Sequence, residues 1–302
     1  MTKQDFLQIT DFNSAELREI FHLAKEIKRL TKEGRCPKPL EGLSLGCIFH
    51  KPSLRTRISF EVGISQLGGH SLYITKNEID LGVRETIADA AQVLSRYLDG
   101  IVIRTFSHKD VEELAEYASV PVINALTDFT HPCQVISDLM TIEEHLGTYE
   151  GCTITYLGDG NNMARSWINA ARRLPIKVRI GTVPDRHPGE LVDIAKTEGA
   201  DVEVIHDAAE AIAGAHVVYT DVFASMGEKQ EAEERANLLK AFQVNSALMA
   251  QANPKAIVMH CLPAERGREI TDEVIDGDQS VVFDQAENRL HAQKAILVTL
   301  LG

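Results

Sequence analysis

The sequence lacks long apolar runs, an excess of positive charge and a regular spacing of cysteines. No stretch approaches the roughly 18 apolar residues that a membrane span requires, and the amino terminus carries no apolar signal core. Acidic residues outnumber basic ones by 44 to 31, for a net charge of −13, which argues against nucleic acid as a partner. Basic residues grouped in so acidic a chain therefore indicate a local anion site.

The five cysteines fit neither a disulfide framework nor a structural zinc site. Their number is odd and no two form a C-x-x-C pair; they are Cys36, Cys47, Cys133, Cys152 and Cys261. We therefore expect reduced thiols, a cytoplasmic location and no membrane partner.

What the sequence does contain is an alternation of strand-like apolar runs and helical spacing, over a length sufficient for two domains. Runs such as Ile101-Val102-Ile103 are typical of parallel strands covered on both faces. The pattern predicts an α/β fold: two doubly wound parallel-sheet domains joined by bridging helices, with the C-terminal helix packing back on the first domain. We place the first domain at residues 1–132 plus 286–302, and the second at 133–285.

The pattern predicts alternating strands and helices along the chain. Strands are expected at 44–49, 71–75, 100–104, 121–124, 152–158, 176–181, 202–205, 216–220, 256–260 and 280–283. A capping box at Asn13 begins a first helix that Gly34 can end. Further helices are expected at 54–67, 87–98, 109–118, 132–146, 162–174, 188–198, 208–213, 246–251 and 285–301.

The turn at residues 53–57, Ser-Leu-Arg-Thr-Arg, lies where the first predicted strand gives way to a helix. A helix N-terminus presents unpaired N–H groups and a partial positive charge. Two hydroxyls and two guanidiniums at that point favour a doubly charged anion such as phosphate. The simpler alternative is a Ser53 N-cap followed by solvated arginines.

Polar residues recur at the carboxyl ends of the other predicted strands, where ligands bind in open α/β sheets. They are Arg104, His131 to Gln134, Gly158 to Asn162, Asp221 and His260 to Pro263. Each has a structural alternative: an ion pair for Arg104, a helix start for His131, an apolar core role for Cys261 and a cap for Asp221. Their recurrence at the same edge predicts a single cleft.

Gly158-x-Gly160 does not complete a dinucleotide-binding fingerprint. Met163 occupies the third glycine position, and Thr182 rather than an acidic residue follows the next strand. This disfavours a nicotinamide oxidoreductase, and no cofactor is expected. The glycines still allow a close approach of the backbone to a ligand.

Ser-x-Arg-Thr-Arg (53–57), His-Pro-x-Gln (131–134) and His-Cys-Leu-Pro (260–263), in that order, resemble the carbamoyltransferases. Gly158 to Asn162, the segment Asp221 to Gly227 and the tail from Phe283 narrow the resemblance to the ornithine branch of that family. It implies a carbamoyl-phosphate domain followed by an amino-acid domain, and a homotrimer or a multiple of trimers.

In such an assembly a loop from the neighbouring subunit, here residues 76–86, contributes to each site. Asp80 stands where the family usually has Gln, Val83-Arg84 replaces Arg-Gly, and Leu54 replaces Thr or Pro. Arg84 is the candidate to supply the neighbour's contact.

The resemblance implies carbamoyl phosphate and L-ornithine as substrates, and L-citrulline and phosphate as products. The residues that it assigns to carbamoyl phosphate are Ser53, Leu54, Arg55, Thr56, Arg57, Arg104, His131, Gln134, Cys261, Leu262 and Arg289. Those assigned to ornithine are Asn162, Asp221, Ser225 and Met226. Arg104, His131, Asp221 and Cys261 are the candidate catalytic residues. No metal is required, because the arginines supply the positive charge.

Several alternatives stay open at this point. Putrescine or another amine could be the acceptor, although it would leave the groups meant for the α-carboxylate without a partner. A non-catalytic carbamoyl-phosphate-binding paralogue is a second alternative, favoured only by Asp80.

The acceptor of the δ-amine proton is either the departing phosphate or Cys261. Arginine metabolism is expected, in the direction of biosynthesis or of breakdown. The charged segment 228–235 is either a solvated loop or a lid over ornithine.

Overall fold

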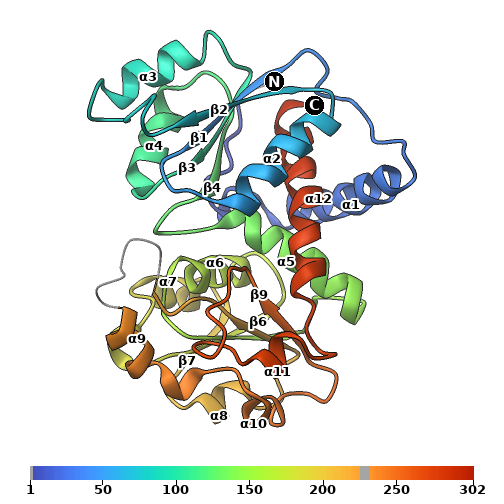
Figure 1. Cartoon of the computed structure of the whole chain (residues 1–302), viewed down its shortest axis with the longest axis vertical. Coiled ribbons are helices and arrows are strands. Elements are labelled where there is room, and N and C mark those ends of the chain that lie inside the picture. Colours follow the sequence, from blue (N-terminus) through green and yellow to red (C-terminus); the bar gives the residue numbers. More distant parts are fainter. Residues whose placement is uncertain (1–2, 225–231) are drawn as a thin grey trace. The chain divides into compact units, whose positions relative to one another are not determined.

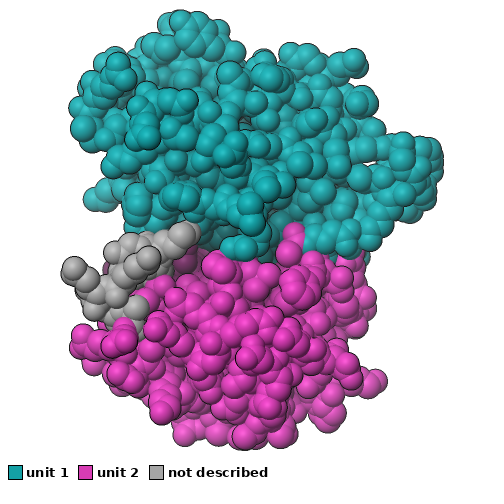
Figure 2. Space-filling view, viewed as in Figure 1, with its two compact units in different colours: residues 1–140, 287–302 teal, residues 141–286 magenta. Residues whose placement is uncertain are grey.

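The computed structural model describes residues 3–224 and 232–302. The chain forms two compact units: unit 1 comprises Met1–Met140 and Glu287–Gly302, and unit 2 comprises Thr141–Ala286 (Figure 2). The chain passes from one unit to the other within helices α5 (Pro132–Leu146) and α12 (Val282–Leu301). The domain boundary placed between residues 132 and 133 stays a prediction.

Unit 1 is built on a four-stranded parallel sheet with the order β2-β1-β3-β4. The strands are β1 (Ser44–Phe49), β2 (His70–Thr75), β3 (Gly100–Arg104) and β4 (Val122–Leu126). From β1 the chain first moves to β2 on one side and then crosses back to β3 on the other side. The topological switch point of the sheet therefore lies between β1 and β3. In register, Phe49 at the end of β1 pairs with Arg104 at the end of β3.

Helices cover both faces of this sheet (Figure 1). They are η1 (Ile9–Asp11), α1 (Ser14–Lys32), α2 (Leu54–Gln66), α3 (Ile87–Leu94), α4 (His108–Tyr117), the first part of α5 and the last part of α12. Apolar residues of α3 and α4, including Ile87 and Leu114, pack with Ile48 and Ile101 of the sheet in one buried cluster. The isoleucine-valine run of β3 is fully buried, as its unbroken apolar sequence predicts.

The C-terminal helix packs on helices of unit 1, which confirms the prediction made for it. Lys28 Nζ on α1 donates to Asn288 Oδ1 on α12 at 2.7 Å, and Lys294 Nζ donates to Thr31 Oγ1 at 3.1 Å. Helix α2 packs next to α12 at Gly63, where a Cβ would lie at an ordinary contact distance of 3.4 Å from Lys294 Cγ.

Unit 2 contains a five-stranded parallel sheet with the order β7-β6-β5-β8-β9. The strands are β5 (Thr153–Leu157), β6 (Lys177–Gly181), β7 (Asp201–Ile205), β8 (Val217–Thr220) and β9 (Ile257–His260). The switch point lies between β5 and β8, since the chain winds outward through β6 and β7 before it returns. The predicted fold class, two doubly wound parallel sheets, is confirmed.

The helices of unit 2 are mostly short. Within the described part of the chain they are α6 (Asn162–Ala171), η2 (Pro184–Arg186), α7 (Leu191–Thr197), α8 (Ala208–Ile212), α9 (Ala232–Leu238), η3 (Lys240–Phe242), α10 (Ser246–Met249) and α11 (Asp272–Ile275). The sequence pattern did not predict α9 (Ala232–Leu238) or α11 (Asp272–Ile275).

The strand expected at 280–283 is wrong. Ser280 forms a single bridge with Val258 of β9, and the chain then enters α12 at Val282. The apolar pair Val281-Val282 is buried, as a strand would be. Val281 N still donates to Val258 O of β9 at 3.0 Å, but Val281 O accepts from Gln285 N at 2.9 Å, and the chain continues as helix α12 instead of a strand. Across the described ranges, we find no helix with the length and apolarity to cross a membrane.

Candidate functional site

The turn between β1 and α2 is fixed by a cap at Ser53. Ser53 has extended φ and ψ, and its Oγ accepts a hydrogen bond from Thr56 N at 3.2 Å. The two hydroxyls of Ser53 and Thr56 lie 3.0 Å apart. The N-cap alternative is therefore correct for Ser53, and the cap also places both hydroxyls at the first turn of α2.

Two guanidinium groups converge on the buried hydroxyl of Thr56. Arg104 Nη1, from the end of β3, lies 3.3 Å from Thr56 Oγ1, and Arg289 Nη2, from α12, lies 2.6 Å from it. Arg104 and Arg289 are themselves buried. Two cations held at a helix N-terminus in unit 1 create a strongly anion-attracting point, because like charges repel unless an anion screens them.

His131, directly before α5, belongs to the same positive environment of unit 1. Burial holds the pKa of His131 well below its ordinary value, and the charges of Arg289 and Arg104 lower it further. The imidazole is therefore neutral at physiological pH and can donate one hydrogen bond without adding a charge.

Gln134 lies on the first turn of α5 and is almost fully buried. Its Nε2 donates to Asp138 Oδ1 at 2.8 Å, one helical turn further on. Among the described residues, no donor reaches its Oε1. Gln134 thus presents a buried hydrogen-bond acceptor, and Asp138 fixes which end of the amide plays that part.

The other residues of the turn have different surroundings. Arg55 is half-buried, and Leu54 is 68% exposed. Arg57 Nε pairs with Glu61 Oε1 at 3.0 Å, and its guanidinium carbon lies 3.6 Å from the centroid of the Tyr73 ring. Arg57 is thus engaged on the exposed side of α2, and its contacts differ from those of Thr56.

The loop 76–86 lies in unit 1. The backbone oxygen of Asp80 accepts from Val83 N at 3.0 Å and from Arg84 N at 3.2 Å, which closes a turn. The Asp80 carboxylate lies 3.7 Å from Lys76 Nζ. Arg84 and Val83 are exposed at the tip of this turn.

In unit 2, the loop after β5 is organised by Asn161 rather than Asn162. Asn161 is the N-cap of α6, and its Oδ1 accepts from the backbone of Met163 and Ala164 and from Tyr156 Oη at 3.1 Å. Its Nδ2 donates to Asp221 Oδ2 at 3.3 Å. Asn162 is the first residue of α6 and is half-buried.

Asp221 and Cys261 lie side by side after β8 and β9. Cys261 Sγ donates to Asp221 Oδ1 at 3.0 Å, and Val222 N donates to the same oxygen at 2.8 Å. Burial and the nearby carboxylates raise the pKa of Tyr156 well above its ordinary value, so its hydroxyl keeps its proton and remains a donor to Asn161.

Leu262 has a left-handed backbone, with φ of 55°, and is the one non-glycine residue with positive φ in the described ranges. Such a conformation costs an ordinary residue about 1 kcal/mol or more. Here Leu262 N donates to His260 Nδ1 at 2.8 Å. The side chain of His260 therefore stabilises the turn that carries Cys261 and Leu262.

Asp221, His260 and Cys261 each place a potential metal-ligating atom within 4.8 Å of the others. His260 nevertheless has no lone pair to offer, because Nδ1 accepts from Leu262 N and Nε2 bonds to Glu269 Oε1 at 3.1 Å. This trio is therefore a poor metal site in the conformation described.

Ser225 and Met226, which the family resemblance assigns to ornithine, lie outside the described residues, as do residues 228–231 of the charged segment. The end of that segment is described. Arg235 on α9 is buried, and its Nη1 lies 3.3 Å from Asp159 Oδ2 in the loop after β5. The pair joins α9 to the loop that contains Asn161.

Gly160 is required by the chain's own backbone. A Cβ here would lie 2.1 Å from Arg186 O and 2.7 Å from Pro188 N, distances that no side chain tolerates. We expected the glycines of this loop to allow a ligand to approach. At position 160 the close approach is instead that of the segment around η2, whose Arg186 O accepts from Gly160 N at 3.0 Å.

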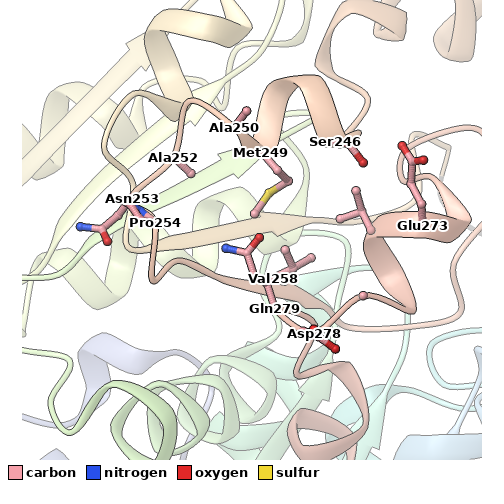
Figure 3. A pocket seen from close by; sticks show the side chains of 12 residues that line it. Ser246, Met249, Ala250, Ala252, Asn253, Pro254, Val258, Glu273, Asp278 and Gln279 are labelled. Atoms are coloured by element: carbon pink, nitrogen blue, oxygen red, sulfur yellow. The ribbon is translucent and has the colours of Figure 1, made fainter.

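A cavity of about 560 Å³ lies elsewhere in unit 2, between α10, α11 and β9 (Figure 3). Met249, Val258 and Gln279 extend toward its interior, with Glu273 and Asp278 at its margin. None of the predicted site residues lines it, so it is separate from the candidate site.

The sequence did not single out Asp138, Tyr156 or Glu269, and it assigned a role to Asn162 rather than to its neighbour Asn161. The preference of Asn for N-caps, just before the apolar face of α6, was a usable signal for Asn161. Asp138 and Glu269 gave none, because their partners are fixed by the tertiary structure.

The family model "Aspartate/ornithine carbamoyltransferase, carbamoyl-P binding domain" matches residues 4–144, and its "Asp/Orn binding domain" counterpart matches residues 150–300. The chain is 49% identical to the ornithine carbamoyltransferase of Methanoculleus marisnigri, covering 99% of this chain and 97% of that protein. It is 52% identical to the ornithine carbamoyltransferase of Rhodopseudomonas palustris, covering 98% and 97%.

Solved structures agree. The structure of ornithine carbamoyltransferase from Pyrococcus furiosus superposes with a TM-score of 0.95 at 49% identity, covering 100% of this chain and 98% of that one. The structure from Thermus thermophilus gives a TM-score of 0.90 at 39% identity, covering 100% of both. The chain therefore belongs to the aspartate/ornithine carbamoyltransferase family.

Proposed function

We propose that this protein transfers the carbamoyl group of carbamoyl phosphate to the δ-amine of L-ornithine, giving L-citrulline and phosphate. The observation that carries the proposal is the convergence of Arg104 and Arg289 on Thr56 at the start of α2. It occurs in a chain about half identical, over nearly its full length, to proteins named ornithine carbamoyltransferase.

The phosphate would bind at the N-terminus of α2. Ser53, Arg55, Thr56 and the first N–H groups of α2 are the proposed ligands, as a hydroxyl- and guanidinium-rich helix start suits a dianion. Positive charge at this point favours the departure of phosphate, because it neutralises the dianion as it forms. Arg57 was also predicted to bind phosphate, but its contacts with Glu61 and Tyr73 lead us to expect a smaller part for it.

The carbamoyl carbonyl becomes an oxyanion during attack. We assign its stabilisation to Arg104, His131 and Thr56, which unit 1 holds in one buried region. The low pKa of His131 suits this role, since a neutral imidazole donates a hydrogen bond without competing with the arginines for the phosphate.

The carbamoyl amino group needs acceptors rather than donors. Gln134 Oε1 is a buried acceptor that no described donor reaches, which supports its assignment to this group. The Leu262 backbone is the second proposed acceptor, and Arg289 and Cys261 would contact the same ligand. Most of the rate would come from aligning the two substrates.

Ornithine carries an α-ammonium, an α-carboxylate and a δ-ammonium. Asp221 suits the α-ammonium and Asn162 the α-carboxylate, with Ser225 and Met226 proposed as further ligands. Cations near the δ-amine would lower its pKa and so favour the nucleophilic form. The released proton would go to the departing phosphate oxygen or to Cys261. The segment 228–235 is proposed to close over ornithine and exclude water.

The decisive experiment supplies carbamoyl phosphate with equal concentrations of ornithine and putrescine, and quantifies citrulline and carbamoylputrescine. We expect citrulline to dominate. A clear excess of carbamoylputrescine would overturn the ornithine assignment, and an absence of phosphate release with both amines present would favour a non-catalytic paralogue.

We further propose a homotrimer or a multiple of it. An apolar stripe on the outer face of α2 supports this assembly, since Leu54, Ile58 and Val62 recur every four residues and are 68%, 49% and 38% exposed. Leu72, on the edge strand β2, adds a further exposed apolar side chain. An exposed helical stripe of this kind is typical of a subunit interface. The proposal that Arg84 reaches a neighbouring site is tested with the same assembly.

We propose that the reaction runs in arginine biosynthesis, because the Pyrococcus furiosus relative, 49% identical, is named as anabolic. We propose a cytoplasmic location, because all five cysteines are free thiols.

A further inference from the structure

Glu269 and His260 form a fully buried pair in unit 2. His260 Nε2 lies 3.1 Å from Glu269 Oε1, and neither side chain is exposed to solvent. The same carboxylate oxygen accepts from Glu265 N at 2.5 Å. Eight residues, 261–268, lie between His260 and Glu269 in the sequence, so the pair closes the loop that follows β9.

The hydrogen bonds fix the tautomer of His260. Nδ1 must carry a lone pair, because it accepts from Leu262 N at 2.8 Å. The ring proton is then on Nε2, where it is donated to Glu269 Oε1. If Nδ1 carried a proton, that N–H would face the N–H of Leu262, and two donors would repel each other. The hydrogen bonds are therefore consistent with the neutral ring that carries its proton on Nε2.

The backbone of His260 is held as well. His260 N donates to Gln285 Oε1 at 2.9 Å, and Gln285 Nε2 donates to Tyr219 Oη at 3.2 Å. Main chain and ring of His260 are therefore both fixed, and the ring in turn holds the peptide that joins Cys261 to Leu262. That peptide leads into the left-handed φ of Leu262.

We propose that Glu269 and His260 are positioning residues for carbamoyl transfer: Glu269 sets the tautomer of His260, and His260 holds the Cys261–Leu262 peptide in the geometry that the substrates require. The proposal rests on the proposed function, which assigns Cys261 and the Leu262 backbone to carbamoyl phosphate. His260 is consequently not the base that deprotonates ornithine, since both ring nitrogens are engaged.

The first test asks whether position 269 needs only a hydrogen-bond acceptor or needs a carboxylate. Glu269→Ala removes the acceptor, and Glu269→Gln keeps an oxygen acceptor for both His260 Nε2–H and Glu265 N–H. We expect E269A to lower kcat/KM for carbamoyl phosphate about tenfold or more, and E269Q to restore most of the loss. Equal kinetics in E269A and wild type would overturn the proposal.

The second test separates the two ring nitrogens of His260. An Asn side chain places its oxygen near the position of Nδ1 and keeps the acceptor for Leu262 N, whereas Gln reaches toward Glu269 and leaves Leu262 N without an acceptor. We expect H260N to retain more carbamoyl phosphate affinity than H260Q. The reverse order would show that the contact with Leu262 does not matter.

A control variant accounts for simple loss of stability. Val202→Ala, in β7 at the opposite edge of the sheet from β9, shortens a buried side chain away from the loop. We expect it to lower Tm without changing KM for carbamoyl phosphate. If E269A and V202A show the same KM at comparable Tm, Glu269 is merely structural.

Nitrogen NMR of histidine-labelled protein tests the tautomer independently of activity. The His260 signals, assigned by their loss in H260N, should show the neutral Nε2–H form in wild type and a mixture in E269A. A protonated or Nδ1–H ring in wild type would overturn the inference even if citrulline forms. Failure of citrulline formation with the expected tautomer would instead count against the proposed function.

Discussion

Gln134 Nε2 donates to Asp138 Oδ1 at 2.8 Å, and both side chains are buried on the first turns of α5. Because Asp138 Oδ1 accepts from the amide nitrogen of Gln134, the Gln134 oxygen points away from the pair. Asp138→Asn provides an NH₂ group and allows the Gln134 amide to flip. We expect affinity for carbamoyl phosphate to fall about tenfold, as one buried acceptor is lost. Calorimetric titration measures it, with Gln134→Leu as the reference for full loss. Unchanged carbamoyl phosphate affinity in D138N would mean that Asp138 does not determine the orientation of the Gln134 amide.

Thr56 is the shared partner of two buried guanidiniums. Thr56→Val keeps the shape of the side chain and removes its oxygen, so both Arg104 and Arg289 lose an acceptor. Hydrogen bonds to charged groups contribute about 1.5–3 kcal/mol, so we expect roughly 10- to 100-fold weaker carbamoyl phosphate binding in T56V. Thr56→Ser keeps the hydroxyl and should bind within a few-fold of wild type. If T56S is as weak as T56V, the methyl group rather than the hydroxyl matters.

Arg55 and Arg57 should differ sharply although they are two residues apart. Arg55→Ala should abolish measurable carbamoyl phosphate binding, because a dianion loses a bidentate partner. Arg57→Ala should change it little, because the Arg57 guanidinium is paired with Glu61 and lies over Tyr73. Binding and turnover of both variants give the comparison. If both variants lost carbamoyl phosphate binding equally, Arg57 would also be a phosphate ligand. If R55A bound carbamoyl phosphate as wild type does, the proposed phosphate site would be wrong.

Cys261 donates to Asp221 at 3.0 Å, and we expect it to serve turnover more than binding. Cys261→Ser keeps a donor to Asp221, but its shorter Cβ–O bond reduces the reach of the side chain, and it replaces the polarisable sulfur. The expected result is a lower kcat with a smaller change in KM for carbamoyl phosphate. Steady-state kinetics with each substrate varied in turn measures both. Parallel losses in kcat and in carbamoyl phosphate binding would indicate a purely structural thiol.

His291, on the buried part of α12, gives unit 1 a pH-sensitive stability. Burial and the charges of Lys294 and Lys28 lower the pKa of His291 from 6.5 to about 4. Between these values the unfolded chain binds a proton that the folded chain does not, so protons favour unfolding. The stability from this group is complete above pH 6.5 and declines as the pH falls toward about 4.

His291→Gln removes that titration. Its Tm should consequently fall less than the wild-type Tm when the pH is lowered through this window, each compared with its own value at neutral pH. Calorimetric scans across the window measure the difference. An identical decline in both proteins would show that other groups account for the acid sensitivity.

Local sequence patterns determined most of the fold. Unbroken apolar runs predicted the buried parallel strands, Asn13 predicted the start of α1, and Ser53 predicted the start of α2, because capping and apolar periodicity act over a few residues. The same patterns overstated the sheet at 280–283, since an apolar pair suits a strand and the buried start of α12 equally.

The sequence by itself also determined which residue types gather at the strand ends, and so allowed the prediction of an anion site at the turn 53–57. Only the tertiary structure decided that Arg104 and Arg289, 185 residues apart in the numbering of this chain, meet at Thr56 while the nearby Arg57 takes other partners. Only it decided that Asp138 and Glu269 orient Gln134 and His260. Contacts of this kind depend on distances between elements that the packing of the sheet and helices sets, and no local pattern encodes those distances.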